Sequence, residues 1–247
     1  MSPYPLPDTY REAVREVTAT ATGAVHRDDP TLPGTGGPAG NARLTAWIGL
    51  LLLPLFGAEL LTLLSLEGLL SWHIAIGVIL IPPALVKTAS TGWRIVRYYA
   101  GAEVYRQAGP PPLLLRVLGP LVVLTTLSLL GTGVLLLLVG PSGAFTPLVT
   151  VAGQRISVLT LHQASTLAWA VATGLHVLGR LVPAVQLAMS GSRSQDPPAG
   201  GWLRTCVFVG TLALAALAAV LALSLGHWSG GDLHHGFDRF PAGSETD

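Results

Sequence analysis

Hydrophobic residues dominate five stretches of the chain, each long enough to cross a lipid bilayer as a helix. These stretches cover roughly residues 44–66, 71–93, 117–139, 158–182 and 204–226. A helix needs about 20 apolar residues to cross a hydrocarbon core that is about 30 Å thick. The polar residues lie in short links that leave no room for a soluble domain. The pattern therefore predicts an all-α, multi-pass transmembrane helical bundle with five spans.

Composition agrees with a membrane protein, because 50% of the residues are hydrophobic and only 11% are charged. Residues 1–43 are rich in Pro, Gly and charge and lack the pattern of a signal peptide, so we expect a disordered cytoplasmic tail with at most a short helix near residues 10–25. The bundle is expected over residues 44–228, followed by an extracytoplasmic tail over residues 229–247. Cys206 is the only cysteine, which excludes an internal disulfide bond.

Basic residues predict the orientation of the bundle, because short cytoplasmic loops retain Lys and Arg. The tail before the first stretch and the second and fourth links contain the residues Arg11, Arg15, Arg27, Arg43, Arg94, Arg97, Arg106, Arg116, Arg180, Arg193 and Arg204. The opposite links have almost none. We therefore expect a protein of the cell membrane with a cytoplasmic N-terminus and an extracytoplasmic C-terminus.

Two histidines lie on one face of the fourth stretch. His162 and His176 are fourteen residues apart, which in a helix means about 21 Å along the axis and a rotation about 40° short of four full turns. An imidazole inside a membrane span is costly unless it faces the bundle and has a partner. The alternative to a ligand role is an interhelical hydrogen bond to Ser or Thr.

A third histidine, His73, lies at the outer end of the second stretch. The second and fourth stretches run in the same direction, so His73 and His162 are expected at similar depth. They would face each other if the two helices are diagonal in the bundle. A low-spin haem iron is held by axial ligands from opposite sides. Lys87 lies fourteen residues inward from His73, and it is therefore expected at the same depth as His176 in the fourth stretch.

Two parallel helices, each with a ligand pair fourteen residues apart, resemble the di-haem membrane cytochromes b, which include the b-type subunits of bacterial hydrogenases and formate dehydrogenases. The segments "WHIAIGVILIPPALVKTASTGWRIVRYYAG", "GPPPLLLRVLGPLVVLT" and "TLHQASTLAWAVATGLHVLGRLVPA" resemble small actinobacterial cytochrome b-like membrane proteins. The resemblance covers about residues 44–190 and implies that four of the five spans form the haem-binding core. It implies ligand roles for His73, His162 and His176. One haem b is expected, and a second is left open because Lys87 stands where a fourth histidine would be.

Three interpretations of Lys87 stay open. Its stem can extend to the headgroups, its ammonium can pair with a haem propionate, or a neutral amine can bind iron. Pro82 and Pro83 directly before it should kink the span. Such a kink would change the direction of all side chains of the span after residue 83, and it could thereby remove the inner haem site.

Glycine spacing offers separate support for a flat ligand between helices. Gly119 and Gly133 in the third stretch are again fourteen residues apart, and Gly77 lies one turn after His73. Positions without a side chain leave room for a porphyrin. Small residues also let membrane helices pack closely without any cofactor, so the spacing alone does not decide between the two.

Two further groups have open roles. Glu59, in the outer half of the first stretch, can exchange a proton during quinol oxidation, or can be a packing residue hydrogen-bonded to Thr62 or Ser65. The histidines near the C-terminus, His227, His234 and His235, can bind a metal or dock a partner, but a histidine-rich tail is weak evidence for either.

The expected function is electron transfer between the quinone pool and an extracytoplasmic redox enzyme, as an electron-transfer protein or as a subunit of a membrane oxidoreductase. The alternative is a haem-free membrane anchor or assembly protein that keeps a cytochrome b-like bundle. The chain has no GxGxxG, P-loop, CxxC or HExxH motif, and no nucleic-acid partner is predicted. Five spans do not divide into the inverted repeats of many transporters.

Overall fold

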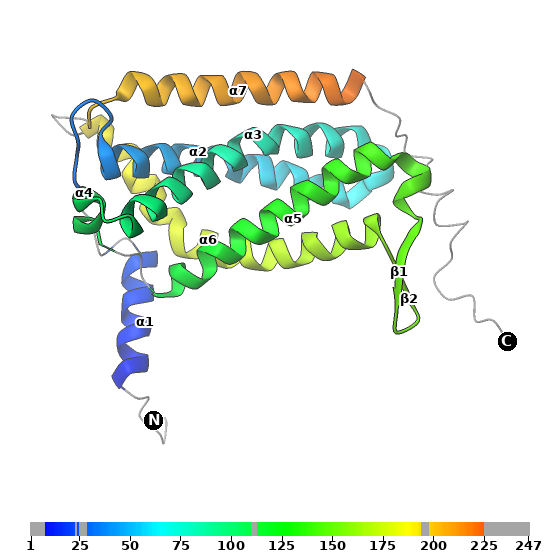
Figure 1. The fold of residues 1–247 in the computed structure, drawn as a ribbon, viewed down its shortest axis with the longest axis horizontal. Coiled ribbons are helices and arrows are strands. Elements are labelled where there is room, and N and C mark those ends of the chain that lie inside the picture. Colours follow the sequence, from blue (N-terminus) through cyan, green and yellow to red (C-terminus); the bar gives the residue numbers. More distant parts are fainter. Residues whose placement is uncertain (1–7, 23, 25–28, 110–112, 194–197, 225–247) are drawn as a thin grey trace. The chain divides into compact units, whose positions relative to one another are not determined.

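The computed structural model describes residues 8–22, 24, 29–109, 113–193 and 198–224. Its helices are α1 Asp8–Ala21, α2 Gly37–Thr62, α3 Leu66–Tyr99, α4 Glu103–Gln107, α5 Leu113–Ala144, α6 Val158–Arg193 and α7 Gly201–Ser224 (Figure 1). One 3-10 turn, η1 (Leu63–Ser65), connects α2 to α3, and the strands β1 (Pro147–Val151) and β2 (Gln154–Ser157) lie between α5 and α6. The fold is mostly helical, as predicted. The C-terminal histidines and the predicted tail over 229–247 lie outside the described residues.

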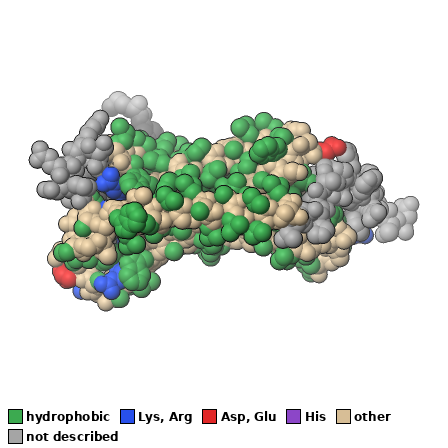
Figure 2. Space-filling model, turned by 90° about the horizontal axis from the view of Figure 1, so that it is seen from above, with side chains coloured by type: hydrophobic (Ala, Val, Ile, Leu, Met, Phe, Trp, Pro, Cys, Tyr) green, Lys and Arg blue, Asp and Glu red, His purple; other side chains and the backbone are tan. Residues whose placement is uncertain are grey.

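Four helical stretches of the described residues are long and apolar enough to cross a membrane, namely Gly37–Tyr99, Arg116–Ala144, Val158–Met189 and Gly201–Ser224. Many large apolar side chains on them point away from the protein interior; Leu138 is 78% exposed and Leu178 is 74% exposed. On the face seen in Figure 2, hydrophobic side chains are spread over most of the described surface, and charged side chains show at few places. Such a surface is unfavourable in water, and a bilayer removes that cost. Length and composition therefore indicate a membrane protein.

The count of five separate spans is not confirmed. The first stretch is 63 residues long, because α2, η1 and α3 follow one another without a polar link. The start of α2 at Gly37 also lies seven residues before residue 44, where the sequence predicts the bundle to begin, and α1 forms within the predicted tail.

The chain packs as two compact units, each built from parts of several helices. The first unit contains Met1–Leu50, Leu85–Val123 and Val171–Val209, and the second contains Leu51–Ala84, Leu124–Ala170 and Gly210–Asp247. In α3 the division falls directly after Pro82 and Pro83, the residues at which the sequence predicts a kink.

In the first unit, α2 and α3 pair in antiparallel directions through polar side chains. The Asn41 side-chain amide donates to the Ser90 carbonyl oxygen (2.9 Å), and the Thr45 and Ser90 hydroxyls are 2.8 Å apart. The Lys87 ammonium donates to the Thr45 carbonyl oxygen at 3.1 Å. Residue numbers rise along α2 as they fall along α3, from the contact of Asn41 with Ser90 to that of Thr45 with Lys87, so the two helices are antiparallel.

The second unit contains two antiparallel helix pairs. Glu59 and Thr62 near the end of α2 contact His73 in α3. In the other pair, the Ser128 hydroxyl of α5 lies 2.8 Å from the Ser165 hydroxyl of α6, and Thr132 contacts His162. Interhelical polar contacts of this kind fix the rotation of each helix about its axis.

A β-hairpin that the sequence reasoning missed connects α5 to α6 (Figure 1). Helix α5 bends where Gly140 (φ 67°) precedes Pro141. The hairpin turns at Ala152 and Gly153, which both have positive φ (48° and 80°), as expected for the tight turn that matches the twist of two strands. Ser157 then starts α6, because its hydroxyl accepts the Thr160 backbone N–H at 3.3 Å.

A buried arginine joins two loops of the first unit at the start of α7. Arg204, only 6% exposed, donates to the carbonyl oxygens of Pro198 (2.6 Å), Ala199 (2.7 Å) and Thr35 (3.2 Å). Gly36 adopts φ +78°, and a Cβ atom built there lies 2.6 Å from the Ala199 carbonyl oxygen. The contact of these loops therefore requires glycine for two reasons, backbone conformation and space.

We predict that Gly36→Ala destabilises the protein more than Gly34→Ala. Both glycines have positive φ, which costs an L-residue about 1–2 kcal/mol, but a Cβ atom at Gly34 meets nothing within 4 Å. The clash with Ala199 adds to the cost only at Gly36. Thermal unfolding of both variants in detergent measures the difference. Equal melting temperatures would show that the loops move apart at little cost.

Candidate functional site

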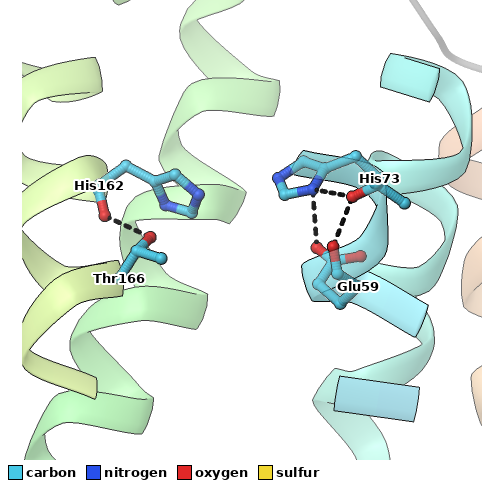
Figure 3. A network of polar contacts seen from close by, with 5 residues as sticks. Glu59, His73, His162 and Thr166 are labelled. Atoms are coloured by element: carbon cyan, nitrogen blue, oxygen red, sulfur yellow. Dashed lines mark hydrogen bonds and ion pairs between the residues drawn. The ribbon is translucent and has the colours of Figure 1, made fainter. Parts of the chain in front are cut away.

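The structure brings His73 and His162 together in the second unit. His73 lies on the second turn of α3 and His162 on the first turn of α6. Their ring centroids are 6.3 Å apart and their planes are nearly perpendicular, at 86°. Figure 3 shows the two rings extending toward each other from their helices. The equal depth that the sequence predicts for these histidines is therefore present in the fold.

The tautomer of both imidazoles follows from the single proton of each neighbouring threonine hydroxyl. The Thr62 hydroxyl donates to the Glu59 backbone carbonyl (2.5 Å), and the Thr132 hydroxyl donates to the carbonyls of Ser128 (2.8 Å) and Leu129 (3.0 Å). With its proton used, each hydroxyl oxygen can only accept at the imidazole.

Nδ1 of His73 lies 2.9 Å from the Thr62 hydroxyl oxygen, and Nδ1 of His162 lies 3.0 Å from that of Thr132. Both rings therefore donate from Nδ1–H, and the proton is absent from Nε2. Within the described part of the chain, no hydrogen bond engages either Nε2 atom. Two basic nitrogens thus face each other, which is favourable only with an electrophile between them.

Glu59 places a carboxyl group beside His73. One carboxyl oxygen, Oε1, lies 3.1 Å from Nδ1 of His73, while Oε2 is buried and has no hydrogen-bond partner among the described residues. Gly77 makes room for this carboxyl group, since a Cβ atom there would lie 3.2 Å from Oε1. The sequence leaves two roles open for Glu59, proton exchange or packing with a hydrogen bond to Thr62 or Ser65, and does not predict the contact of its carboxyl group with His73.

The two imidazoles lie in a pocket bounded by α2, α3, α5 and α6. Its space is about 1120 Å³, including the part that opens to the surroundings. Most lining residues are Leu, Ile and Val, and the polar or partly polar ones are Glu59, His73, Thr126, His162, Thr166 and Trp169. Gly77 and Gly133 also line it, and a Cβ atom at Gly133 would lie 3.3 Å from Cε1 of His162. The absence of a side chain at Gly133 therefore provides the space that the His162 ring occupies.

Trp169 is a pocket residue that the sequence reasoning missed. It is only 5% exposed, its indole N–H has no partner among the described residues, and its ring meets the edge of Phe56 at a centroid distance of 4.7 Å. The signal was present in the sequence, because His162, Trp169 and His176 follow one another at seven-residue intervals, which keeps them on one helix face.

The other predicted site residues, Lys87, Gly119 and His176, belong to the first unit and do not line this pocket. Lys87 bonds to the Thr45 carbonyl, and a Cβ atom at Gly49 would lie 2.7 Å from its ammonium nitrogen. Nδ1 of His176 is buried without a hydrogen-bond partner among the described residues. A Cβ atom at Gly119 would meet nothing within 4 Å. No described hydrogen bond joins Lys87 to His176.

The donor set limits the kind of ligand that fits. Among the described residues, no group of three or more His, Cys, Asp or Glu side chains is placed to hold a metal ion. A bare zinc ion takes three or four protein ligands. A macrocycle with four nitrogens of its own needs only two axial ligands, and two imidazoles are what the pocket presents.

Comparison with profiles of known protein families, with curated proteins and with solved structures finds no significant match.

We predict that Thr132→Val lowers stability relative to Thr166→Val. Valine at 132 removes the acceptor for the buried Nδ1–H of His162, at a cost of about 1–2 kcal/mol. The Thr166 hydroxyl instead donates to the His162 backbone carbonyl (2.9 Å), so its loss leaves the ring unaffected. Melting temperatures of both variants in detergent measure the effect. A Thr166→Val variant as unstable as Thr132→Val would contradict the assigned hydrogen bonds.

Proposed function

We propose that this protein is a membrane b-type cytochrome that binds one haem b between His73 and His162 and transfers electrons. The observation that carries the proposal is the facing pair of imidazoles with Nδ1 hydrogen-bonded and Nε2 available. A metal–imidazole bond is about 2 Å long and the ring centroid lies about 1 Å behind the nitrogen, so imidazoles on one iron have centroids about 6 Å apart. The distance of 6.3 Å between the rings fits this value.

The surroundings of the pair also fit the proposal. A porphyrin has a large apolar surface, and apolar side chains form most of the pocket. Gly133 and Gly77 keep side chains away from His162 and from Glu59. Iron-binding histidines generally donate their second N–H to an oxygen acceptor, and both histidines do so here.

Haem bound in this pocket would supply one-electron chemistry. His73 and His162 would be the residues that hold the haem in place. Electron transfer, rather than ligand activation, follows from such a donor set. The pocket's apolar wall of Leu and Ile side chains excludes water from the ligating nitrogens.

For the topology we propose five crossings with a cytoplasmic N-terminus in the cell membrane. Antiparallel contacts between α2 and α3 in each unit support two crossings for the 63-residue stretch. The arginines gather in the segments assigned to the cytoplasm. Arg43 stacks on Trp47 and Arg97 on Trp93, at 5.1 and 5.6 Å, as is typical of a membrane interface.

The proposed electron partners are a quinone in the bilayer and an extracytoplasmic redox enzyme. The basis is the position of the pocket, because His73 and His162 lie close to η1 and to the β-hairpin, at helix ends assigned to the outer side. We restrict the proposal to one haem, since Lys87 is engaged with the Thr45 carbonyl.

We predict that His73→Ala and His162→Ala each abolish the haem signal, whereas His176→Ala retains it. Loss of either axial imidazole leaves the iron with one protein ligand, while His176 lies outside the pocket. Reduced-minus-oxidised spectra and pyridine haemochrome per polypeptide measure the outcome, with one haem expected in the unmodified protein. A colourless preparation would favour the haem-free anchor, and loss of signal only in His176→Ala would place the haem in the first unit.

The angle between the imidazole planes predicts a spectroscopic signature. Because the planes are 86° apart, the oxidised haem should give a highly anisotropic low-spin ferric spectrum, as perpendicular axial histidines do. Electron paramagnetic resonance of the purified protein at cryogenic temperature measures it. A spectrum typical of parallel imidazoles would contradict the ring orientations.

A further inference from the structure

The two histidines of the pocket have unequal polar neighbours. Nδ1 of His162 has one hydrogen-bond partner, the neutral hydroxyl of Thr132. Nδ1 of His73 has the Thr62 hydroxyl as its hydrogen-bond partner, and in addition the Glu59 carboxyl oxygen Oε1 lies 3.1 Å from it as an ion-pair contact. The rings themselves face each other in similar surroundings, so this carboxyl group is the main chemical difference between them (Figure 3).

We propose that Glu59 is a positioning residue that lowers the reduction potential of a haem held by His73. This inference rests on the proposed function. Glu59 would act through the imidazole and not by touching iron, because its Oε1 atom lies against Nδ1, on the side of the ring away from His162.

One turn of α2 holds the carboxyl group in place. Glu59 and Thr62 are three residues apart, and the Thr62 hydroxyl bonds to the Glu59 backbone carbonyl. The hydroxyl that bonds to Nδ1 of His73 and the carboxyl group that lies beside it therefore come from one turn. Gly77 on α3 provides the space that Oε1 occupies.

Electrostatics sets the direction of the effect. The iron centre has one more positive charge when oxidised, and a carboxyl group 3.1 Å from Nδ1 of its ligand attracts that charge more strongly. The pocket is apolar and Oε2 is buried without a partner among the described residues, so solvent screens this interaction little. Glu59 therefore favours the oxidised state, which means a lower potential.

The Thr62 hydroxyl separates this role from haem binding. Because Thr62 alone can accept the Nδ1–H bond at 2.9 Å, the tautomer that leaves Nε2 available persists without the carboxyl group. Replacement of Glu59 by an amide of the same shape is therefore expected to change the potential and to leave the haem bound.

The test is a spectrophotometric redox titration of full-length protein in detergent at one fixed pH. E59Q is expected to raise the ferrous-to-ferric ratio at a given ambient potential at least tenfold, a shift of about +59 mV for one electron. Haem per polypeptide should equal that of the unmodified protein. E67Q is the matched control, because Glu67 is an exposed carboxyl group in the first turn of α3, the helix that carries His73, and does not line the pocket; its ratio should change less than twofold.

A second variant keeps the test decisive. Glu59→Asp retains the carboxyl group but withdraws it from Nδ1, so a smaller shift in the same direction is expected. Haem-loaded E59Q with a ratio within twofold of the unmodified protein, or E59D with a larger shift than E59Q, would overturn the role of Glu59 and leave the proposed cytochrome standing. Absence of haem from the unmodified protein would instead overturn the proposed function itself.

Discussion

The pocket of the second unit depends on how two threonine hydroxyls use their single protons. Thr62 and Thr132 each donate to carbonyls of their own helix, a common arrangement for threonine in a helix. Each oxygen is thereby limited to accepting, and the adjacent imidazole must donate from Nδ1. The Nε2 lone pair of each histidine is then directed into an apolar space. This arrangement is unfavourable without a partner for the two nitrogens, and the proposed haem would supply one.

The helix pairs turn this local constraint into a site. Thr62 and His73 face each other because α2 and α3 are antiparallel around η1, and Thr132 faces His162 because α5 and α6 are antiparallel around the β-hairpin. Each histidine is thus oriented by the helix it pairs with, and its own helix only presents it. A rotation of α2 or α5 about its axis would break the hydrogen bond to Thr62 or Thr132 and free the imidazole to turn, although His73 and His162 themselves stay unchanged.

The sequence predicts the apolar helices and the histidine pair well, since both depend on length and on position along a helix. His73, His162 and Gly133 are found at one pocket by counting depth alone. Thr62 and Thr132 are missed because a hydroxyl in an apolar helix has no spacing that distinguishes a histidine partner from an ordinary bond to its own helix. The β-hairpin is missed because its strands are exposed and short, and its only signal is the Ala152–Gly153 turn. Lys87 and His176 show that the fourteen-residue interval determines depth and helix face but does not determine which residues of the neighbouring helices a side chain contacts.

Lys87 and Glu59 illustrate two ways in which this fold accommodates an ionisable group inside an apolar helix. Lys87 donates to a carbonyl of the neighbouring helix in the space beside Gly49, so protein atoms meet part of its need for polar contacts and two helices are held together. Glu59 has only one oxygen on His73, and its other oxygen remains buried without a described partner. A carboxyl group in an apolar pocket is tolerated where positive charge is close, and a metal on the far nitrogen of the His73 ring would supply it. Under the proposed function, the lysine would serve helix packing, whereas the glutamate would serve a centre that gains and loses charge.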